Sequence, residues 1–214
     1  MPSAADIFTG EMGSGTVYLM YGAAGVGKTT LALCVAAKTI RRGRAVVWVD
    51  CGGRLYLPRL HQLFESTKAD PSMIYISQPM TFREQSEAML KVADLLPTNT
   101  GLVVVDDFTY LHRIALSGDV SQDLHIYEML AFQAALIKEV SVERGLPALL
   151  IGHVHEIPQL GLKAPVASRI VTFWSDVVLS INYDGVVREV VEEKPGAGRI
   201  TFRITEAGAF PSQS

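Results

Sequence analysis

Short apolar runs alternate along the chain with longer segments in which apolar residues recur every three or four positions. A short apolar run bounded by glycine, proline or polar residues is typical of a strand buried on both faces of a parallel sheet. We expect such strands at residues 17–21, 45–50, 73–77, 102–107 and 147–154. A spacing of three and four residues is typical of an amphipathic helix. We expect helices in the second half of 17–42 and at 58–67, 82–96 and 123–144.

The last of these helices carries a continuous apolar stripe. It comprises Leu124, Tyr127, Leu130, Ala131, Ala134, Ile137 and Val140. Because these positions share one helix face, we expect the stripe to pack in the core. Three other segments lack a regular pattern, and glycine or polar residues interrupt them. We expect a lead-in at 1–16, a polar and flexible stretch at 108–122, and a long irregular loop at 156–169.

The pattern changes towards the end of the chain, where polar and apolar residues alternate. Residues 176–183 and 186–193 flank Asp184 and Gly185, a pair that predicts a two-residue β-hairpin turn. Residues 199–205 alternate cleanly and predict a third antiparallel strand. The sequence therefore predicts an α/β fold, in which a mainly parallel central sheet lies between helices and continues into a C-terminal antiparallel meander.

Composition and charge narrow the class of protein further. A chain of 214 residues that is 49% hydrophobic suits one well-buried domain, so we expect a single domain over 1–214 with 1–16 as its lead-in. The net charge of −3 excludes proteins that bind nucleic acid through a strongly basic surface. Cys34 and Cys51 lack the spacing of a metal site, and we interpret them as reduced thiols.

No apolar run reaches the length that spans a membrane. The first residues are neither basic nor apolar enough for a signal peptide. We therefore expect a cytoplasmic protein that does not associate with a membrane.

The candidate chemistry begins directly after the first predicted strand. Gly22, Gly27, Lys28 and Thr29 fill the pattern G-x-x-x-x-G-K-[ST], in which backbone N–H groups surround phosphate oxygens and the lysine reaches the terminal phosphates. The glycines, Gly25 included, let the backbone approach an anion. The Thr29 hydroxyl is placed to bind the Mg²⁺ that accompanies the phosphates. The predicted nucleotide-binding residues are Gly22, Ala23, Ala24, Gly25, Val26, Gly27, Lys28, Thr29 and Thr30.

A second candidate group lies at the end of the strand at 102–107, which finishes in Asp106 and Asp107. In phosphate-loop proteins an aspartate at this place binds Mg²⁺, so Asp106 would complete the metal site that Thr29 begins. The alternative for Asp106 is an ordinary aspartate in a surface turn. ATP and Mg²⁺ are the cofactors that these residues predict.

The order of these motifs resembles the RecA/RadA recombinase superfamily, and most closely its archaeal RadB-like paralogues. The resemblance covers nearly the whole chain and rests on GAAGVGKTTLAL, WVDCGGRLYLPRL, LVVVDDFTYLHR, LLIGHV, APVASRIVTFWSDVVLSI and FRITEAG, in that order. It implies a RecA-like ATPase core. Gly52 stands where this superfamily usually carries the glutamate that orients the attacking water. Efficient hydrolysis through that base is therefore not expected.

Two further departures concern catalysis. His153 stands where the superfamily has a glutamine that senses the terminal phosphate, and Asp107 stands where serine or threonine is usual. Lys28, Asp107 and His153 are the catalytic candidates. We hypothesise that Asp107 supports slow hydrolysis as a base, with a carboxylate that caps the following turn as the alternative.

The resemblance implies an ATP-binding accessory factor in homologous recombination and DNA repair, with weak or absent ATP hydrolysis. Its expected partners are a recombinase or other recombination proteins, with weak binding of single-stranded DNA as a further candidate. We expect a monomer or a small homo-oligomer. The corresponding DNA loops, at 113–121 and 155–167, hold few cations to neutralise phosphates. Two alternatives remain: an active DNA-dependent ATPase that uses Asp107, and a KaiC-like regulatory protein that does not bind DNA.

Overall fold

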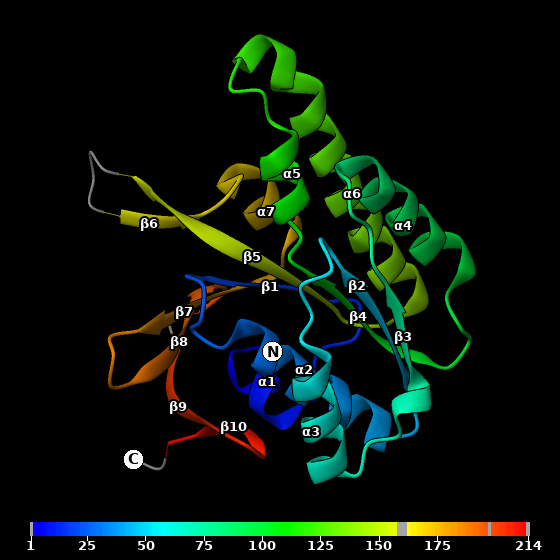
Figure 1. Cartoon of the computed structure of the whole chain (residues 1–214), viewed down its shortest axis with the longest axis vertical. Helices are drawn as coiled ribbons and strands as arrows, with labels where there is room; N and C mark the ends of the chain where they lie inside the picture. The colour runs from blue at the N-terminus through cyan, green and yellow to red at the C-terminus, as the bar shows by residue number, and fades with distance from the viewer. Residues whose placement is uncertain (1, 158–161, 197, 213–214) are drawn as a thin grey trace.

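The computed structural model describes residues 2–157, 162–196 and 198–212, and its strands form one twisted sheet (Figure 1). The sheet order is β10-β9-β8-β7-β1-β5-β4-β2-β3, and β6 pairs with β5. The strands are β1 (Val17–Gly22), β2 (Ala45–Asp50), β3 (Ile74–Ser77), β4 (Thr100–Asp106), β5 (Ala148–Ile157), β6 (Leu162–Pro165), β7 (Val177–Tyr183), β8 (Arg188–Lys194), β9 (Arg199–Thr205) and β10 (Gly208–Pro211). The α/β prediction is confirmed.

The pairing divides the sheet into a parallel part and an antiparallel part. Strands β3, β2, β4, β5, β1 and β7 pair with one another in parallel, in that order. Strands β7 to β10 pair as an antiparallel meander, and β6 pairs antiparallel to β5. Since parallel strands end at the same edge of a sheet, their last residues meet there. In register, Asp50 lies opposite Asp106, and Gly22 lies opposite His153. This edge therefore holds the residues that the motifs single out.

Helices cover both faces of the sheet (Figure 1). They are α1 (Ala5–Thr9), α2 (Lys28–Arg41), α3 (Leu57–Thr67), α4 (Phe82–Leu95), α5 (Tyr110–Ala115), α6 (Val120–Arg144) and α7 (Ser168–Trp174), with a 3₁₀ turn at Pro71–Met73. Successive residues of β1 point to opposite faces, as the pleat of a strand requires. Tyr18 and Met20 pack with α1, α2 and α3, and Leu19 packs with α4 to α7. Among the described helices, none is long and apolar enough to cross a membrane.

The structure corrects the predictions for the irregular segments. The stretch at 108–122 contains α5, and α6 begins at Val120, where the Asp119 carboxylate accepts a hydrogen bond from the Ser121 amide. The lead-in contains α1, and the strand β10 was not predicted. The loop at 156–169 contains β6 and the start of α7, while 158–161 lie outside the described residues.

The predicted two-residue hairpin turn is also wrong. Tyr183 pairs with Arg188, so four residues, 184–187, connect β7 to β8. The Asp184 carboxylate accepts hydrogen bonds from the amides of Val186 and Val187. An aspartate that binds the amides two and three positions ahead stabilises a wider turn than Asp-Gly alone indicates.

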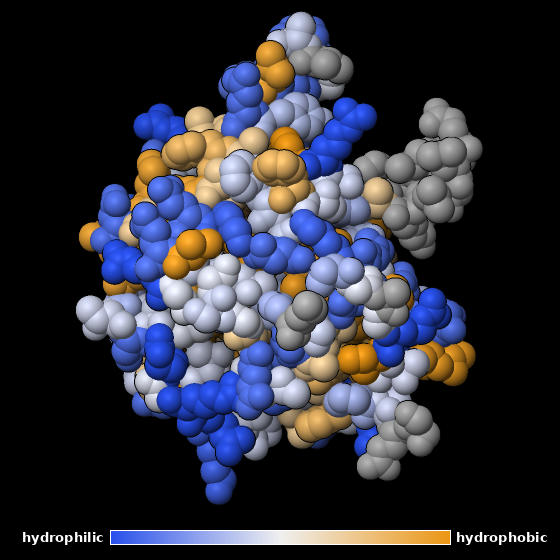
Figure 2. Space-filling model, turned by 180° about the vertical axis from the view of Figure 1, so that it is seen from behind, coloured by the Kyte–Doolittle hydropathy of each residue, from blue (hydrophilic) through white to orange (hydrophobic). Residues whose placement is uncertain are grey.

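The apolar stripe of α6 is buried only in its C-terminal half. Leu130, Ala134, Ile137 and Val140 lie in the core, whereas Leu124 is 59% exposed and Tyr127 is 37% exposed. With α4 and α5, this exposed half borders an apolar groove. Its lining includes Phe82, Leu90, Ala115, Ile126, Met129 and Phe132. Apolar side chains gather on this face of the molecule in Figure 2.

Candidate nucleotide-binding site

The loop between β1 and α2 forms an open cradle at the carboxyl edge of the sheet. Gly25 and Gly27 have φ of +79° and +108°, a region in which glycine is unstrained. A Cβ on Gly25 would have no heavy atom within 4 Å, so space lies beside this residue. A Cβ on Gly22 would lie 2.5 Å from the carbonyl oxygen of Ile181. Glycine is therefore required at 22 for packing, and at 25 the backbone is left open to a ligand.

Lys28 closes the cradle from the first turn of α2. Its Nζ donates hydrogen bonds of 2.8 Å to the carbonyl oxygens of Gly22 and Ala23. Burial lowers the pKa of this lysine, which the carboxylates of Asp107 and Asp106 partly offset. A buried ammonium is stabilised by an anion close to it. An entering phosphate would supply that anion.

Thr29 and Asp106 lie together beside the cradle. The Thr29 hydroxyl donates a hydrogen bond of 2.7 Å to Oδ2 of Asp106. Burial raises the pKa of Asp106 to about 6, which means that the carboxylate lacks a sufficient counter-charge. A hydroxyl and a carboxylate are oxygen ligands of the kind that Mg²⁺ prefers, so the residues present fit this ion. Within the described ranges no cluster of three His, Cys, Asp or Glu residues could hold a metal, so phosphate and water oxygens would complete its coordination.

Asp107 and His153 form a second pair in the site. Oδ2 of Asp107 lies 3.0 Å from Nε2 of His153, and burial is the main cause that lowers the pKa of this histidine. Oδ1 of Asp107 accepts hydrogen bonds from the amide and the hydroxyl of Thr109, at 2.9 and 3.0 Å. One oxygen therefore caps the following turn, as the structural interpretation of Asp107 requires. The other oxygen faces the histidine.

These groups surround a cavity of about 140 Å³. Its lining residues are Ala24, Gly25, Lys28, Thr29, Arg54, Asp106, Asp107 and His153. Seven of these eight were predicted from the sequence, and Arg54 was not. The other predicted loop residues, which are Gly22, Ala23, Val26, Gly27 and Thr30, do not line the cavity; Val26 is 5% exposed and packs in the core.

Arg54 and Tyr110 are the part of the site that sequence reasoning missed. The Arg54 guanidinium lies 4.6 Å from the centroid of the Tyr110 ring. A Cβ on Gly52 would lie 2.5 Å from Cε1 of Tyr110, and Gly52 has φ of +86°. A signal was available, because Gly52 and Arg54 follow the end of β2, where the ends of parallel strands meet.

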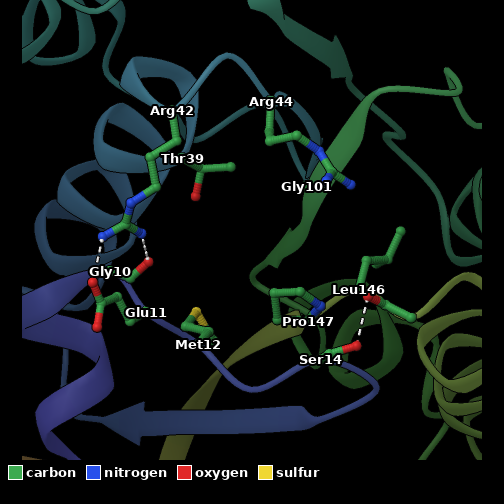
Figure 3. A pocket seen from close by; sticks show the side chains of 11 residues that line it. Gly10, Glu11, Met12, Ser14, Thr39, Arg42, Arg44, Gly101, Leu146 and Pro147 are labelled. Atoms are coloured by element: carbon green, nitrogen blue, oxygen red, sulfur yellow. Dashed lines mark hydrogen bonds and ion pairs between the residues drawn. The ribbon is translucent and has the colours of Figure 1, made fainter.

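A second hollow lies where the lead-in and the end of α2 meet the starts of β4 and β5 (Figure 3). Two arginines line it. Arg42 donates to the backbone carbonyls of Thr9 and Gly10, and Arg44 donates to those of Asn99 and Thr100. The two guanidinium groups therefore bind backbone carbonyls of neighbouring segments and hold these segments in place. The nucleotide-binding candidate remains the cavity beside Lys28.

Comparison with known proteins agrees with this fold. The chain belongs to the AAA domain family, which matches residues 1–156. It is similar to the DNA repair and recombination protein RadB of Methanococcus maripaludis strain C5, at 27% identity over 95% of this chain and 94% of that protein. It is also similar to the RadB proteins of Methanocaldococcus jannaschii, at 27% identity over 95% and 96%, and of Halobacterium salinarum, at 28% over 95% and 89%.

A solved structure shows the same fold. The crystal structure of the RadB recombinase covers 99% of this chain and 98% of its own, with a TM-score of 0.78 and 24% identity. The resemblance to the RecA/RadA superfamily and to its RadB-like members is confirmed.

Proposed function

We propose that this chain is an ATP-binding, RadB-like accessory factor in homologous recombination and DNA repair, with weak or absent ATP hydrolysis. The observation that carries the proposal is the combination of a complete phosphate cradle with Gly52 at the place of the usual catalytic glutamate. In this proposal residues 1–214 act as one RecA-like ATPase domain in the cytoplasm. Its similarity to proteins named for DNA repair and recombination supports the biological role.

ATP and Mg²⁺ are the proposed ligands. Residues 22–30 would surround the phosphates, Lys28 would bind the terminal phosphates, and Thr29 with Asp106 would hold Mg²⁺. When bound, Mg²⁺ neutralises phosphate charge. The two carboxylates and the lysine already line one cavity, so the groups that would bind the ligand are close together before it enters.

Nucleotide would act here mainly as a conformational ligand. His153 lies in β5, and the same strand continues towards the loop at 155–167, part of which lies outside the described residues. A hydrogen bond from His153 to a terminal phosphate would compete with the contact to Asp107 and could reposition the strand. Coupling of this kind needs only different affinities of the two conformations for ATP. The partner would be a recombinase or another recombination protein, with weak single-stranded DNA binding and a monomeric or small homo-oligomeric state.

The second candidate function is a DNA-dependent ATPase in which Asp107 is the base. The position of Asp107 at the cavity, with Oδ2 turned to His153, favours this candidate over a purely binding role. Asp107 would accept a proton from the water that attacks the terminal phosphorus. The hydrogen bonds from Thr109 to Oδ1 instead favour the structural role.

The test measures ATP binding and ATP turnover by the purified protein, with and without single-stranded DNA and a recombinase from the same organism. Lys28→Ala and Asp107→Asn are compared with the unchanged chain. Saturable ATP binding that needs Lys28, with little turnover and a partner affinity that ATP changes, supports the accessory factor. Turnover that needs Asp107 and rises with DNA supports the ATPase. A protein that binds no ATP contradicts both.

A further inference from the structure

Arg54 is a cation in the cavity that the phosphate-loop motif does not explain. It lines the cavity together with Lys28 and lies in the turn that follows β2. Among the described residues, the ion pairs do not include Arg54, although four other arginines or lysines are paired. Its guanidinium therefore has donors that are free to bind a ligand in the cavity.

The turn that carries Arg54 is held rigidly by the carboxylate of Asp50. Oδ1 of Asp50 accepts hydrogen bonds from the amides of Arg54 and Leu55, at 2.8 and 3.0 Å. Oδ2 accepts a hydrogen bond of 2.9 Å from Nε2 of Gln78. Asp50 is 1% exposed, so this buried carboxylate fixes the backbone from which the arginine side chain extends.

The side chain is held in turn by Tyr110. The guanidinium stacks over the Tyr110 ring at 4.6 Å, within the range of a cation–π contact. The ring can occupy this place only because residue 52 has no Cβ, which would lie 2.5 Å from ring atom Cε1. Gly52, which stands in place of the usual glutamate, therefore makes room for the Tyr110 ring that supports Arg54.

The size and charge of the cavity indicate which part of a nucleotide reaches Arg54. A volume of about 140 Å³ equals a few water molecules, which suits a phosphoryl group and is too small for a nucleoside. Lys28 and Arg54 carry two positive charges, and Asp106 and Asp107 carry two negative charges when ionised. A phosphoryl group with its Mg²⁺ would therefore meet both cations within one cavity. The planar guanidinium suits two phosphate oxygens at once.

We propose that Arg54 binds the terminal phosphate of ATP from within the same chain and makes the site prefer ATP to ADP, with Tyr110 as its positioning residue. This inference rests on the proposed function as an ATP-binding protein. It supplies what an accessory factor needs, because a residue that contacts only the third phosphate distinguishes the two nucleotides without hydrolysis.

The experiment measures the affinities of ATP and ADP, each with Mg²⁺, by isothermal titration calorimetry. Arg54→Ala should weaken ATP binding by about 10-fold to 100-fold, the loss expected for charge-assisted hydrogen bonds, and ADP binding by less than about threefold. Arg54→Lys, which keeps the charge but not the planar group, should give an intermediate loss. Arg83→Ala is the matched control, since Arg83 is an exposed arginine that is paired with Glu87 and does not line the cavity, and it should change neither affinity.

Tyr110 is tested with two variants. Tyr110→Phe keeps the ring beneath the guanidinium and should preserve the preference for ATP, whereas Tyr110→Leu should reduce it. In the Arg54→Ala background, Tyr110→Leu should cause no additional loss of ATP affinity, because the arginine it positions is absent. Thermal unfolding of each variant without nucleotide separates this effect from a loss of folding.

The possible failures are distinguishable. An unchanged protein that binds neither nucleotide overturns the proposed function itself. If the protein without substitutions binds both ATP and ADP, and Arg54→Ala weakens neither affinity or weakens both equally, only the role of Arg54 is overturned. Additive losses from the Tyr110→Leu and Arg54→Ala changes overturn the positioning role of Tyr110.

Discussion

Gly52 shows how a single residue changes what a site can do. The position lies in the turn that follows β2, and its amide donates a hydrogen bond of 2.8 Å to the Pro79 carbonyl. Its φ of +86° is strained for any residue with a side chain. The ring of Tyr110 fills the place where a side chain would begin. The packing around residue 52 therefore leaves no room for the side chain of the usual glutamate.

We predict that Gly52→Glu does not restore hydrolysis. The new side chain would strain the backbone and displace Tyr110, which should lower the free energy of unfolding by about 1–3 kcal/mol. Turnover and chemical denaturation are the measurements. Gly53→Glu is the neighbouring control: Gly53 also has a positive φ, of +61°, but its Cβ would lie 3.5 Å from the nearest atom. A marked rise in turnover with unchanged stability of Gly52→Glu would contradict this account.

His112 is a buried titratable group outside the predicted site. It is 0% exposed and lies edge-on to the rings of Phe82 and Tyr127, at 5.7 and 4.9 Å between centroids. Neither ring nitrogen has a hydrogen-bond partner among the described residues. Burial lowers the pKa of His112 to about 4, and the Asp123 carboxylate opposes this shift. The folded protein therefore holds His112 uncharged.

We predict that His112 makes the protein sensitive to acid. Its pKa is lower in the folded state than its usual value near 6.5, so the unfolded chain binds more protons between pH 6.5 and 4. Stability from this group is complete above pH 6.5 and falls by about 3 kcal/mol as the pH drops to 4. Urea unfolding at several pH values measures the loss.

His112→Phe serves as the control for this prediction, because it keeps an aromatic ring but cannot be protonated. The raised pKa of Asp106 gives the opposite slope in the same window, so the difference between the two proteins isolates the histidine. Equal losses of stability in both proteins would contradict the prediction.

At the scale of elements, α6 shows what the spacing of apolar residues can predict and what it cannot. The spacing of apolar residues identified the helix, but it could not show where the sheet beneath the helix ends. The N-terminal half of α6 extends beyond the sheet in Figure 1, and Leu124 and Tyr127 are exposed there. The start of the helix depended on a local signal, the Asp119 cap, which the periodicity does not contain.

We predict that two leucines of the same stripe respond differently to truncation. Leu130→Ala removes a side chain that is 0% exposed and should lower the free energy of unfolding by about 2–5 kcal/mol. Leu124→Ala removes an exposed side chain and should change it by less than about 0.5 kcal/mol. Chemical denaturation of both variants checks the contrast. A large loss for Leu124→Ala would show that α6 packs differently.

At the scale of the whole molecule, the sequence predicted the fold class because buried parallel strands and phosphate loops have strong local signals. Asp106 and Thr29 were expected to meet, and they do, at 2.7 Å. Arg54 and Tyr110 were missed because their contact joins the turn after β2 to the start of α5, and periodicity carries no information about such contacts. Likewise, β10 was missed because it is short and pairs only with β9.

The last prediction concerns ligand binding and the stability of the complete chain. A ligand that binds only the folded state at 100 times its dissociation constant stabilises a protein by about 2.7 kcal/mol. For a chain of this length, ATP with Mg²⁺ should therefore raise the melting temperature by roughly 5–10 °C. Differential scanning fluorimetry measures the shift.

Removal of Mg²⁺ with EDTA should reduce this thermal shift, because the Thr29 hydroxyl and the Asp106 carboxylate would then face the phosphates without the ion between them. Thr29→Val should make the remaining shift nearly independent of Mg²⁺, whereas Lys28→Ala should abolish it with or without the metal. Thr67→Val is the matched control for Thr29→Val, since Thr67 lies at the end of α3 and does not line the cavity. If the shift survives in Lys28→Ala, the nucleotide binds elsewhere on the molecule, and the phosphate cradle is not its site.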